Sequence, residues 1–277
     1  PLCDPSVIPT MLLCELARQD VVVALSGDGG DGAFGGYERY LAAPTMQRLN
    51  FLLTALGPFA RALAKRPERL HHRKFFRVLD EVRGRNSLMD RYRAIMTMVT
   101  PEVRRDMWSD RALNQVSMQD PEEAFARIWN GSHLLSPLWH MQYQDLRTYL
   151  PGDLLAKTDI ASMSSSLEVR SPFLDQEVLR VAAAIPPQHL IHGNQTKLVL
   201  RQLASEMLPP ALMQRRKQGF GVPIAKWLRG PLQEVVMDTL LGSDSQRTGW
   251  FQTAKVASLV NRHMAGEDAH KEIWPLF

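Results

Sequence analysis

Apolar residues recur at the spacing of an α-helix along most of the chain. After a helix-start signal at Asp4–Ser6, this spacing runs from Ile8 to Ala17 and predicts one helix with one buried face. From Phe34 onward it predicts further helices, at residues 37–43, 46–65, 74–83, 88–99, 122–134, 138–150, 152–163, 176–184, 196–206, 223–229, 231–241 and 252–264. Most of the chain is therefore expected to be helical.

A different pattern follows the first helix. Val21–Leu25 is a continuous apolar run between polar residues, which is typical of a strand covered on both faces in a parallel sheet. No other segment gives a clear strand pattern. Because a single parallel strand leaves its backbone groups without partners, we expect its sheet neighbours to lie before Pro1. The residues after Leu25 would then stand at the carboxyl end of a strand, where open α/β sheets bind ligands.

Composition narrows the class of protein. The 277 residues are 45% hydrophobic and 22% charged, which fits a globular protein with a large core. A net charge of +4 suits nucleotides as readily as nucleic acid. Cys3 and Cys14 form no disulfide or zinc pattern, and no apolar run or leader points to a membrane or to export, so a reducing cytoplasm fits best. Since the chain opens on Pro1 and closes on an apolar, uncapped end, we expect it to be a fragment truncated at both ends.

The segment Ser26–Gly32 carries the candidate chemistry. It combines glycines that allow close backbone approach with one hydroxyl and two carboxylates. Such a loop can present N–H groups to a phosphate, while an aspartate holds Mg²⁺ or accepts a proton. The alternatives are a plain Gly/Asp turn and a calcium loop, but a calcium loop requires a terminal Glu that the spacing does not supply.

Three ordered segments resemble glutamine-dependent asparagine synthetases. Val23–Asp31 followed by Phe34–Tyr40 resembles the second nucleotide loop of that family. Leu150–Met163 and then Ser166–Asp175 resemble its central signature, and Arg216–Pro223 resembles its lysine-bearing loop. The resemblance implies an α/β fold of the adenine-nucleotide α-hydrolase kind, also called an ATP-pyrophosphatase fold. This chain would be its carboxy-terminal portion, predominantly helical with one or few parallel strands. Residues 1–45 would be the remnant of the α/β nucleotide-binding core, and residues 46–277 the mainly helical part.

The resemblance also implies a reaction. Aspartate would be adenylated on its side-chain carboxylate by ATP and Mg²⁺, and ammonia would displace AMP to give asparagine. The ammonia would come from glutamine through an amino-terminal glutaminase domain of the same polypeptide, and an upstream pyrophosphate loop would complete the ATP site. Neither segment is in this chain. A homodimer stays open, and neither nucleic acid nor membrane is an expected partner.

Roles carry over to matching positions of this sequence. The resemblance assigns ATP contacts to the first part of the loop, namely Ser26, Gly27, Gly29 and Gly30. It assigns proton acceptance to Asp28, Mg²⁺ binding to Asp31, and contact with phosphate and leaving pyrophosphate to Lys217.

Other charged residues are expected to be structural or to support the site indirectly. Buried charges that pair with each other often hold helices together, and this is our interpretation of Lys157, Asp159, Glu168 and Arg170. Asp153 falls one residue out of register with a family position and is left out. The basic stretch at residues 65–77 fits a solvated helix face over a packed stripe better than a nucleic-acid patch.

The loop departs from the family pattern at Gly32, where most relatives carry Glu. The change removes a carboxylate and weakens the first helical turn, so Mg²⁺ affinity or ammonia handling could suffer. Two alternatives therefore stay open: a degenerate, non-catalytic regulatory domain, and an amidotransferase of the same superfamily that acts on another carboxylate. We expect the isolated chain not to make asparagine.

Overall fold

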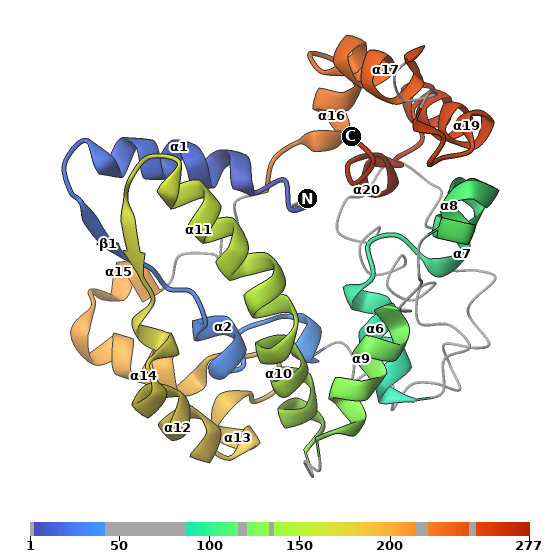
Figure 1. Ribbon diagram of the computed structural model, residues 1–277. Coiled ribbons are helices and arrows are strands. Elements are labelled where there is room, and N and C mark those ends of the chain that lie inside the picture. The colour runs from blue at the N-terminus through green and yellow to red at the C-terminus, as the bar shows by residue number, and fades with distance from the viewer. Residues whose placement is uncertain (1–2, 42–86, 116–120, 133–135, 214–220, 244–247) are drawn as a thin grey trace.

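The computed structural model describes residues 3–41, 87–115, 121–132, 136–213, 221–243 and 248–277. Within these ranges the chain is mainly helical, with one small sheet at the left margin of the view in Figure 1. The first elements are helix α1 (Val7–Arg18), strand β1 (Val23–Leu25) and the short helix α2 (Gly30–Ala33). The first helix and the first strand are thus confirmed.

Helices make up the rest of the described chain. The segment on the right of Figure 1 contains α6 (Leu88–Met96), α7 (Pro101–Met107), α8 (Asp110–Gln115) and α9 (Pro121–Asn130). The central segment contains α10 (Pro137–Arg147), a π-helical turn (Leu150–Leu155) and α11 (Ala156–Met163). A 3-10 helix (Pro172–Leu174) precedes α12 (Gln176–Ala184), α13 (Pro187–Leu190), α14 (Leu198–Met207) and α15 (Pro210–Met213). The last segment contains α16 (Ile224–Arg229), α17 (Gln233–Leu241), α19 (Thr253–Met264) and α20 (His270–Ile273).

Several predicted helices begin where a side chain caps them. The Ser87 hydroxyl accepts a hydrogen bond from the Asp90 N–H (3.0 Å) at the start of α6. The Asp175 carboxylate likewise accepts from the Glu177 N–H (2.8 Å) at the start of α12. These local bonds satisfy donors that a helix leaves unpaired. The predictions at 46–65 and 74–83, and the basic stretch at 65–77, lie outside the described residues.

Among the described residues, several short helices after α2 lie outside the predicted ranges. They are α7, α8, α13, α15 and α20. With seven residues or fewer each, they complete too few turns for an apolar period to stand out. The predicted helix at 152–163 is present as α11, but a π-helical turn that starts at Leu150 precedes it.

The sheet consists of two parallel strands in the described part of the chain. Strand β2 (Glu168–Arg170) pairs with β1 so that Val23 lies opposite Glu168 and Leu25 opposite Arg170. The sequence did not predict β2, because its alternating charged residues mask a three-residue strand. The prediction that β1 is covered on both faces is wrong for these residues, since Val23 and Leu25 are exposed and only Ala24 points into the protein.

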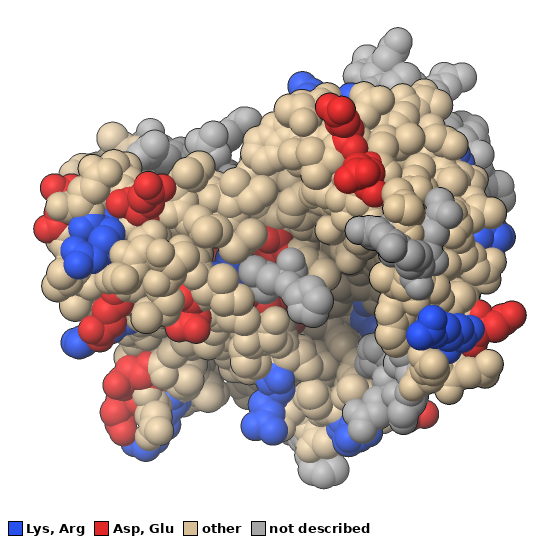
Figure 2. Space-filling model, turned by 45° about the horizontal axis from the view of Figure 1, so that its top comes forward, with Lys and Arg blue, Asp and Glu red and all other residues tan. Residues whose placement is uncertain are grey.

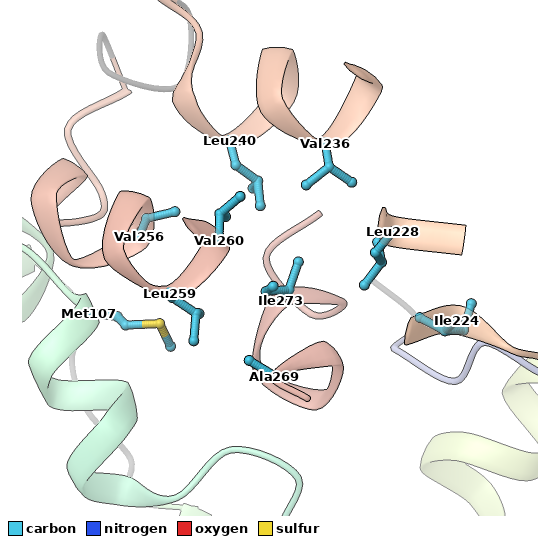
Figure 3. Close-up of a cluster of buried hydrophobic side chains, with 10 residues drawn as sticks. All are labelled: Met107, Ile224, Leu228, Val236, Leu240, Val256, Leu259, Val260, Ala269 and Ile273. Atoms are coloured by element: carbon cyan, nitrogen blue, oxygen red, sulfur yellow. The ribbon is translucent and has the colours of Figure 1, made fainter. Parts of the chain in front are cut away.

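Three clusters of buried side chains hold the described elements together. One surrounds α2 and α10 and is rich in aromatic residues, among them Phe34, Tyr40, Tyr92 and Trp129. A small one, built on Cys14, Ala161 and Leu167, joins α1 and α11 to the sheet. The third lies among α16, α17, α19 and α20 and is almost entirely aliphatic, with Met107 of α7 reaching into it (Figure 3). No helix in the described ranges is both long and apolar enough to cross a bilayer.

Candidate functional site

The candidate site begins where the two strands end. Because β1 and β2 are parallel, their carboxyl ends meet at one edge of the sheet, and Ser26 and Ser171 follow them there. The two hydroxyl oxygens lie 3.0 Å apart. The sequence placed Ser26 at the carboxyl end of a strand, and the structure confirms that position. Ser171 joins the site through a strand that the sequence did not reveal.

Asp28 is held by hydroxyl groups. Its Oδ2 atom accepts hydrogen bonds from Ser26 Oγ and from Thr158 Oγ1 of α11, both at 3.0 Å. Among the described residues no cation forms an ion pair with this carboxylate. Neutral donors orient a carboxylate without adding a positive charge beside it, so Asp28 keeps acceptor capacity for a further proton donor.

Asp31 has a different partner. Its Oδ1 atom lies 3.0 Å from Lys197 Nζ, and both side chains are about one third exposed, at 28% and 33%. Lys197 stands immediately before α14 with a φ of 55°, a conformation that non-glycine residues rarely adopt. Lys197 was not predicted from the sequence, because no motif surrounds it and only the fold brings it to the loop.

Three of the glycines that follow Asp28, namely Gly29, Gly30 and Gly36, leave little room for a larger side chain. Gly29 has a φ of 87°, and a Cβ at this position would run into the Leu174 side chain. At Gly30 a Cβ would lie 3.2 Å from the Phe173 ring. At Gly36 it would collide with Asp31 and Lys197 themselves. Gly29 and Gly30 thus let α2 pack tightly against the 3-10 helix, and Gly36 leaves room for the Asp31–Lys197 pair.

Gly27 differs from these glycines. It is exposed, and a Cβ there would meet no described atom within 4 Å. Packing among the described residues therefore does not explain why this position is glycine. An unobstructed backbone at the end of a strand is what a close approach by a phosphate requires.

Gly32 is buried and faces α10. A Cβ there would lie 3.6 Å from Leu146 Cδ2, which is an ordinary contact. Gln142 of α10 donates its amide hydrogens to the carbonyl oxygens of Gly32 and Ala33, at 2.8 and 2.9 Å. These bonds fix α2 against α10.

A cluster of buried polar and aromatic side chains connects α10 to the segment that follows α2. Asp145 of α10 accepts hydrogen bonds from Arg39 Nη2 and Tyr40 Oη, both at 2.7 Å, and its side chain is only 2% exposed. The Arg39 guanidinium also lies over the rings of Tyr37 and Tyr149, at 3.6 and 4.6 Å from their centroids. Burial raises the pKa of Tyr149 to about 12, with the Arg39 charge opposing the rise. This group anchors the segment that carries Asp31.

The four charged residues expected to pair within the core behave differently from one another. Lys157 Nζ donates to Asp4 Oδ2 (2.8 Å) and to Ser6 Oγ (2.9 Å), and thereby ties α11 to the start of α1. Burial raises the pKa of Asp4, but the hydrogen bonds from Lys157 and Ser6 outweigh it and hold that pKa below its usual value. Lys157 is thus paired as expected, but with a partner that was not predicted.

The other three do not form buried pairs in the described residues. Glu168 and Arg170 bond to each other at 2.7 Å but are 56% and 65% exposed, so the expectation of burial is wrong for them. They are exposed because they lie on the open face of the sheet. The exposed Asp159 carboxylate makes no ion pair with any residue that the structure describes.

Asp153 was left out of the predicted site, and it lies close to this group of charges. Burial raises the pKa of its carboxyl, and the nearby Asp4 charge raises it further. Lys217, which was predicted to contact phosphate, lies outside the described residues.

The charged residues are not confined to the outer surface. In Figure 2 the surface is hollowed near the middle of the view, and acidic and basic side chains are visible inside the hollow. A cavity of about 350 Å³ lies elsewhere, among α6, α9 and α10, and none of the loop residues lines it. No group of three or more His, Cys, Asp or Glu side chains in the described ranges could hold a metal ion by itself.

Comparison with known proteins gives a consistent result. The family model for asparagine synthase matches residues 1–277. The chain is 31% identical over 276 residues to the glutamine-hydrolyzing asparagine synthetase 1 of Bacillus subtilis, with 99% of this chain and 42% of that protein covered. It is 32% identical over 288 residues to the "Putative asparagine synthetase (glutamine-hydrolyzing)" of Mycobacterium bovis, with 100% and 41% covered. The chain thus spans about two fifths of the length of these relatives. No solved structure matches it significantly.

Proposed function

Because the chain belongs to the asparagine synthase family, we propose that it supplies the second nucleotide loop of an ATP-dependent amidating enzyme. In this proposal ATP activates the side-chain carboxylate of aspartate as β-aspartyl-AMP, and ammonia from glutamine displaces AMP. The products are asparagine, AMP and pyrophosphate. The fold would be of the adenine-nucleotide α-hydrolase kind, since the small parallel sheet carries the loop at its carboxyl edge.

The observation that supports the proposal most strongly is that three residues of the loop, Gly27, Asp28 and Asp31, have different surroundings. Gly27 leaves the backbone open at the strand end, Asp28 is held by neutral hydroxyls, and Asp31 faces a lysine. A polyphosphate, a proton donor and a divalent cation would each find a suitable group within a few residues.

Mg²⁺ would be held by Asp31 together with phosphate oxygens. Mg²⁺ is usually bound through one or two carboxylates plus substrate phosphates, which suits a site where Asp31 is partly exposed. When bound, the ion offsets negative charge on the polyphosphate. Lys197 keeps the Asp31 carboxylate in place through its ion pair, and in this proposal its ammonium group would contact the same phosphates. Lys217 would be the second lysine at the leaving pyrophosphate.

Asp28 would accept a proton from the attacking ammonia or from the tetrahedral adduct. Its bonds from Ser26 and Thr158 fix the direction of the carboxylate and leave its other oxygen, Oδ1, available. A positioned base of this kind typically contributes about 10² to 10⁴ in rate.

Nucleotide binding tests the proposal. The measurement is calorimetric titration of ATP into a polypeptide of the relatives' full length that contains this chain, called the full-length polypeptide below. Binding is expected to require Mg²⁺ and to be lost in Asp31→Ala. The matched control is Asp106→Ala, which removes a carboxylate from an exposed pair with Lys255 (2.8 Å) far from the loop. If the affinity for ATP is the same without Mg²⁺ and in Asp31→Ala, the result would favour the degenerate, non-catalytic alternative.

The isolated 277-residue chain is expected not to make asparagine. The proposal places the first pyrophosphate loop and the glutaminase outside these residues, so ATP would be contacted from one side only. A sensitive AMP-release assay with ATP, aspartate and ammonium is the measurement. Turnover by the isolated chain would contradict this expectation, but the assignment to the family would still hold.

A further inference from the structure

The register of the sheet brings two serine hydroxyls together. The Ser26 N–H donates to the Arg170 carbonyl (2.8 Å), so the ladder continues past the last paired residues and sets Ser26 beside Ser171. Side chains alternate between the two faces of a sheet, so these serines share a face with Ala24 and Val169. That face is the covered one, because Ala24 and Val169 pack against the cluster that joins α1 and α11 to the sheet.

Helix α11 supplies a third hydroxyl group on this face. The helix lies beside β2 (Figure 1), and its Ala161 is fully buried against the sheet. Thr158 comes three residues earlier and so lies on the same side of the helix. Its Oγ1 donates to Asp28 Oδ2 (3.0 Å). The neighbouring Lys157 is bonded to Asp4 (2.8 Å) at the start of α1, and this ion pair holds that part of α11 in place.

The direction of each hydrogen bond follows from the carboxylate of Asp28. An ionised carboxylate only accepts hydrogen bonds, so the Ser26 hydroxyl donates its single hydrogen to Asp28 Oδ2 (3.0 Å). Ser171 is therefore the donor in the 3.0 Å contact between the two serine oxygens. The Ser26 oxygen also accepts from the Asp28 N–H (3.3 Å). The donor and both acceptor positions of the Ser26 hydroxyl are thus filled, and the Ser171 bond fixes where its hydrogen points.

We propose that Ser171 is a positioning residue for Asp28 and that it acts through Ser26. By donating to Ser26 Oγ, Ser171 directs the Ser26 hydrogen to Asp28 Oδ2. Together with the bond from Thr158, this fixes the carboxylate so that Oδ1 is the oxygen that receives the proton from the attacking nitrogen. The inference rests on the proposed role of Asp28 and adds to it a residue that follows strand β2.

The surroundings of Ser171 favour this role over a packing role. Among the described residues, its partly buried hydroxyl bonds to Ser26 alone. Asp28 forms no ion pair with a described cation, so its orientation depends on hydroxyl groups. Loss of one of these bonds is therefore expected to disturb the direction of the carboxylate, while the packing around the strands stays the same.

The test measures the two halves of the reaction separately in the full-length polypeptide. Exchange of labelled pyrophosphate into ATP reports formation of the adenylate, and asparagine formation from ammonia also requires the proton transfer. Ser171→Ala is expected to lower asparagine formation about three- to tenfold, the range for one hydrogen bond, and to leave exchange within about twofold. Ser171→Thr keeps the hydroxyl and should retain both rates. Equal losses in Ser171→Ala and Ser171→Thr, or a parallel loss of exchange, would overturn the proposal.

A double-mutant cycle tests whether the effect passes through Ser26. In a Ser26→Ala background the hydroxyl that Ser171 orients is gone. Adding Ser171→Ala should then lower asparagine formation by less than about twofold. If Ser171→Ala lowers the rate by the same factor in both backgrounds, Ser171 does not act through Ser26 and the proposal is wrong.

Two further variants complete the test. Ser164→Ala is the matched control, because it removes a hydroxyl that donates to the nearby Ala161 carbonyl (2.7 Å) at the end of α11, and it should change neither rate. Asp28→Asn separates this inference from the proposed function. Unchanged asparagine formation in Asp28→Asn would contradict both. A reduced rate in Asp28→Asn beside an unchanged rate in Ser171→Ala would overturn only the role of Ser171.

Discussion

Ser26, Gly27 and Asp28 lie among hydroxyl groups and open space, whereas the residues from Gly29 to Gly36 are enclosed by packed side chains. We call the first three the loop mouth and the others the loop base. In the mouth, hydrogen bonds from Ser26 and Thr158 hold Asp28, and the exposed Gly27 has no described atom near its missing Cβ. In the base, most residues are buried, and α2 is bonded to α10 through Gln142.

The difference shows that one glycine-rich motif serves two purposes. Gly29, Gly30 and Gly36 of the base meet steric demands of the folded chain, while Gly27 of the mouth meets none that the described residues impose. Changes at Gly29, Gly30 and Gly36 should therefore reduce stability. Changes in the mouth should reduce ligand binding at nearly constant stability.

The largest effect is expected from Asp145→Ala, in the part of α10 that packs near the base. Loss of the Asp145 carboxylate leaves the Arg39 guanidinium and the Tyr40 hydroxyl buried without this partner. Breaking a buried ion pair in this way typically costs about 3 to 5 kcal/mol of unfolding free energy. Chemical denaturation of the variant and of the unchanged protein measures this loss of unfolding free energy. The control is Glu168→Ala, whose pair with Arg170 is exposed and should contribute at most about 1 kcal/mol. Similar losses in both variants would contradict the account of the base.

The next effect is expected from Gly29→Ala. Alanine must adopt a φ of 87° there, and its Cβ would press on Leu174. Strain and overpacking together are expected to cost about 2 to 4 kcal/mol of unfolding free energy, read from the same denaturation curves. A loss below about 0.5 kcal/mol, the range of an ordinary surface substitution, would mean that the base is not tightly packed.

The sequence revealed the mouth better than the base. The apolar run before Leu25 and the hydroxyl and carboxylates after it can be recognised locally, so the position of Ser26 and Asp28 at a strand end was predictable. The steric reasons for Gly29 and Gly30 depend on Leu174 and Phe173, which are far away in the sequence. No local pattern reports such a contact.

Long-range contacts also explain why strand β2 and the position of Lys197 were not predicted from the sequence. Strand β2 has only three residues, two of them charged, and its pairing with β1 is a long-range contact. Lys197 reaches Asp31 only because the 3-10 helix and α12 to α14 return the chain to the loop. Helices α6 and α12 were predictable because capping residues mark their starts and apolar residues recur along them.

A smaller effect is expected from Gly27→Ala in the mouth. The unfolding free energy should stay within about 0.5 kcal/mol, since a Cβ meets no described atom. Binding of ATP with Mg²⁺ to the full-length polypeptide should weaken about tenfold, which corresponds to about 1.4 kcal/mol, because the methyl group would obstruct a phosphate. Calorimetry gives the affinity. Unchanged affinity would mean that the open backbone is not a phosphate contact.

The smallest effect is a gain, expected from Gly32→Ala. The backbone at Gly32 is helical, and a Cβ would make an ordinary contact with Leu146 at 3.6 Å. Alanine should therefore raise the unfolding free energy by about 0.5 to 1 kcal/mol through the reduced freedom of the unfolded chain. A loss of stability would show that the space beside Leu146 is too small, and that glycine at this position is a packing requirement like Gly29.

The most direct test of the central claim compares Asp28→Asn with Asp31→Asn in the full-length polypeptide, with each half of the reaction followed separately. Exchange of labelled pyrophosphate into ATP reports adenylation of aspartate, and asparagine formation from ammonia reports the complete reaction. We predict that Asp28→Asn retains exchange but loses about 10² to 10⁴ in asparagine formation, because only the proton acceptor is removed. Asp31→Asn should lose both, because Mg²⁺ would be held poorly. Equal loss of exchange in the two variants would contradict the separate roles of Asp28 and Asp31.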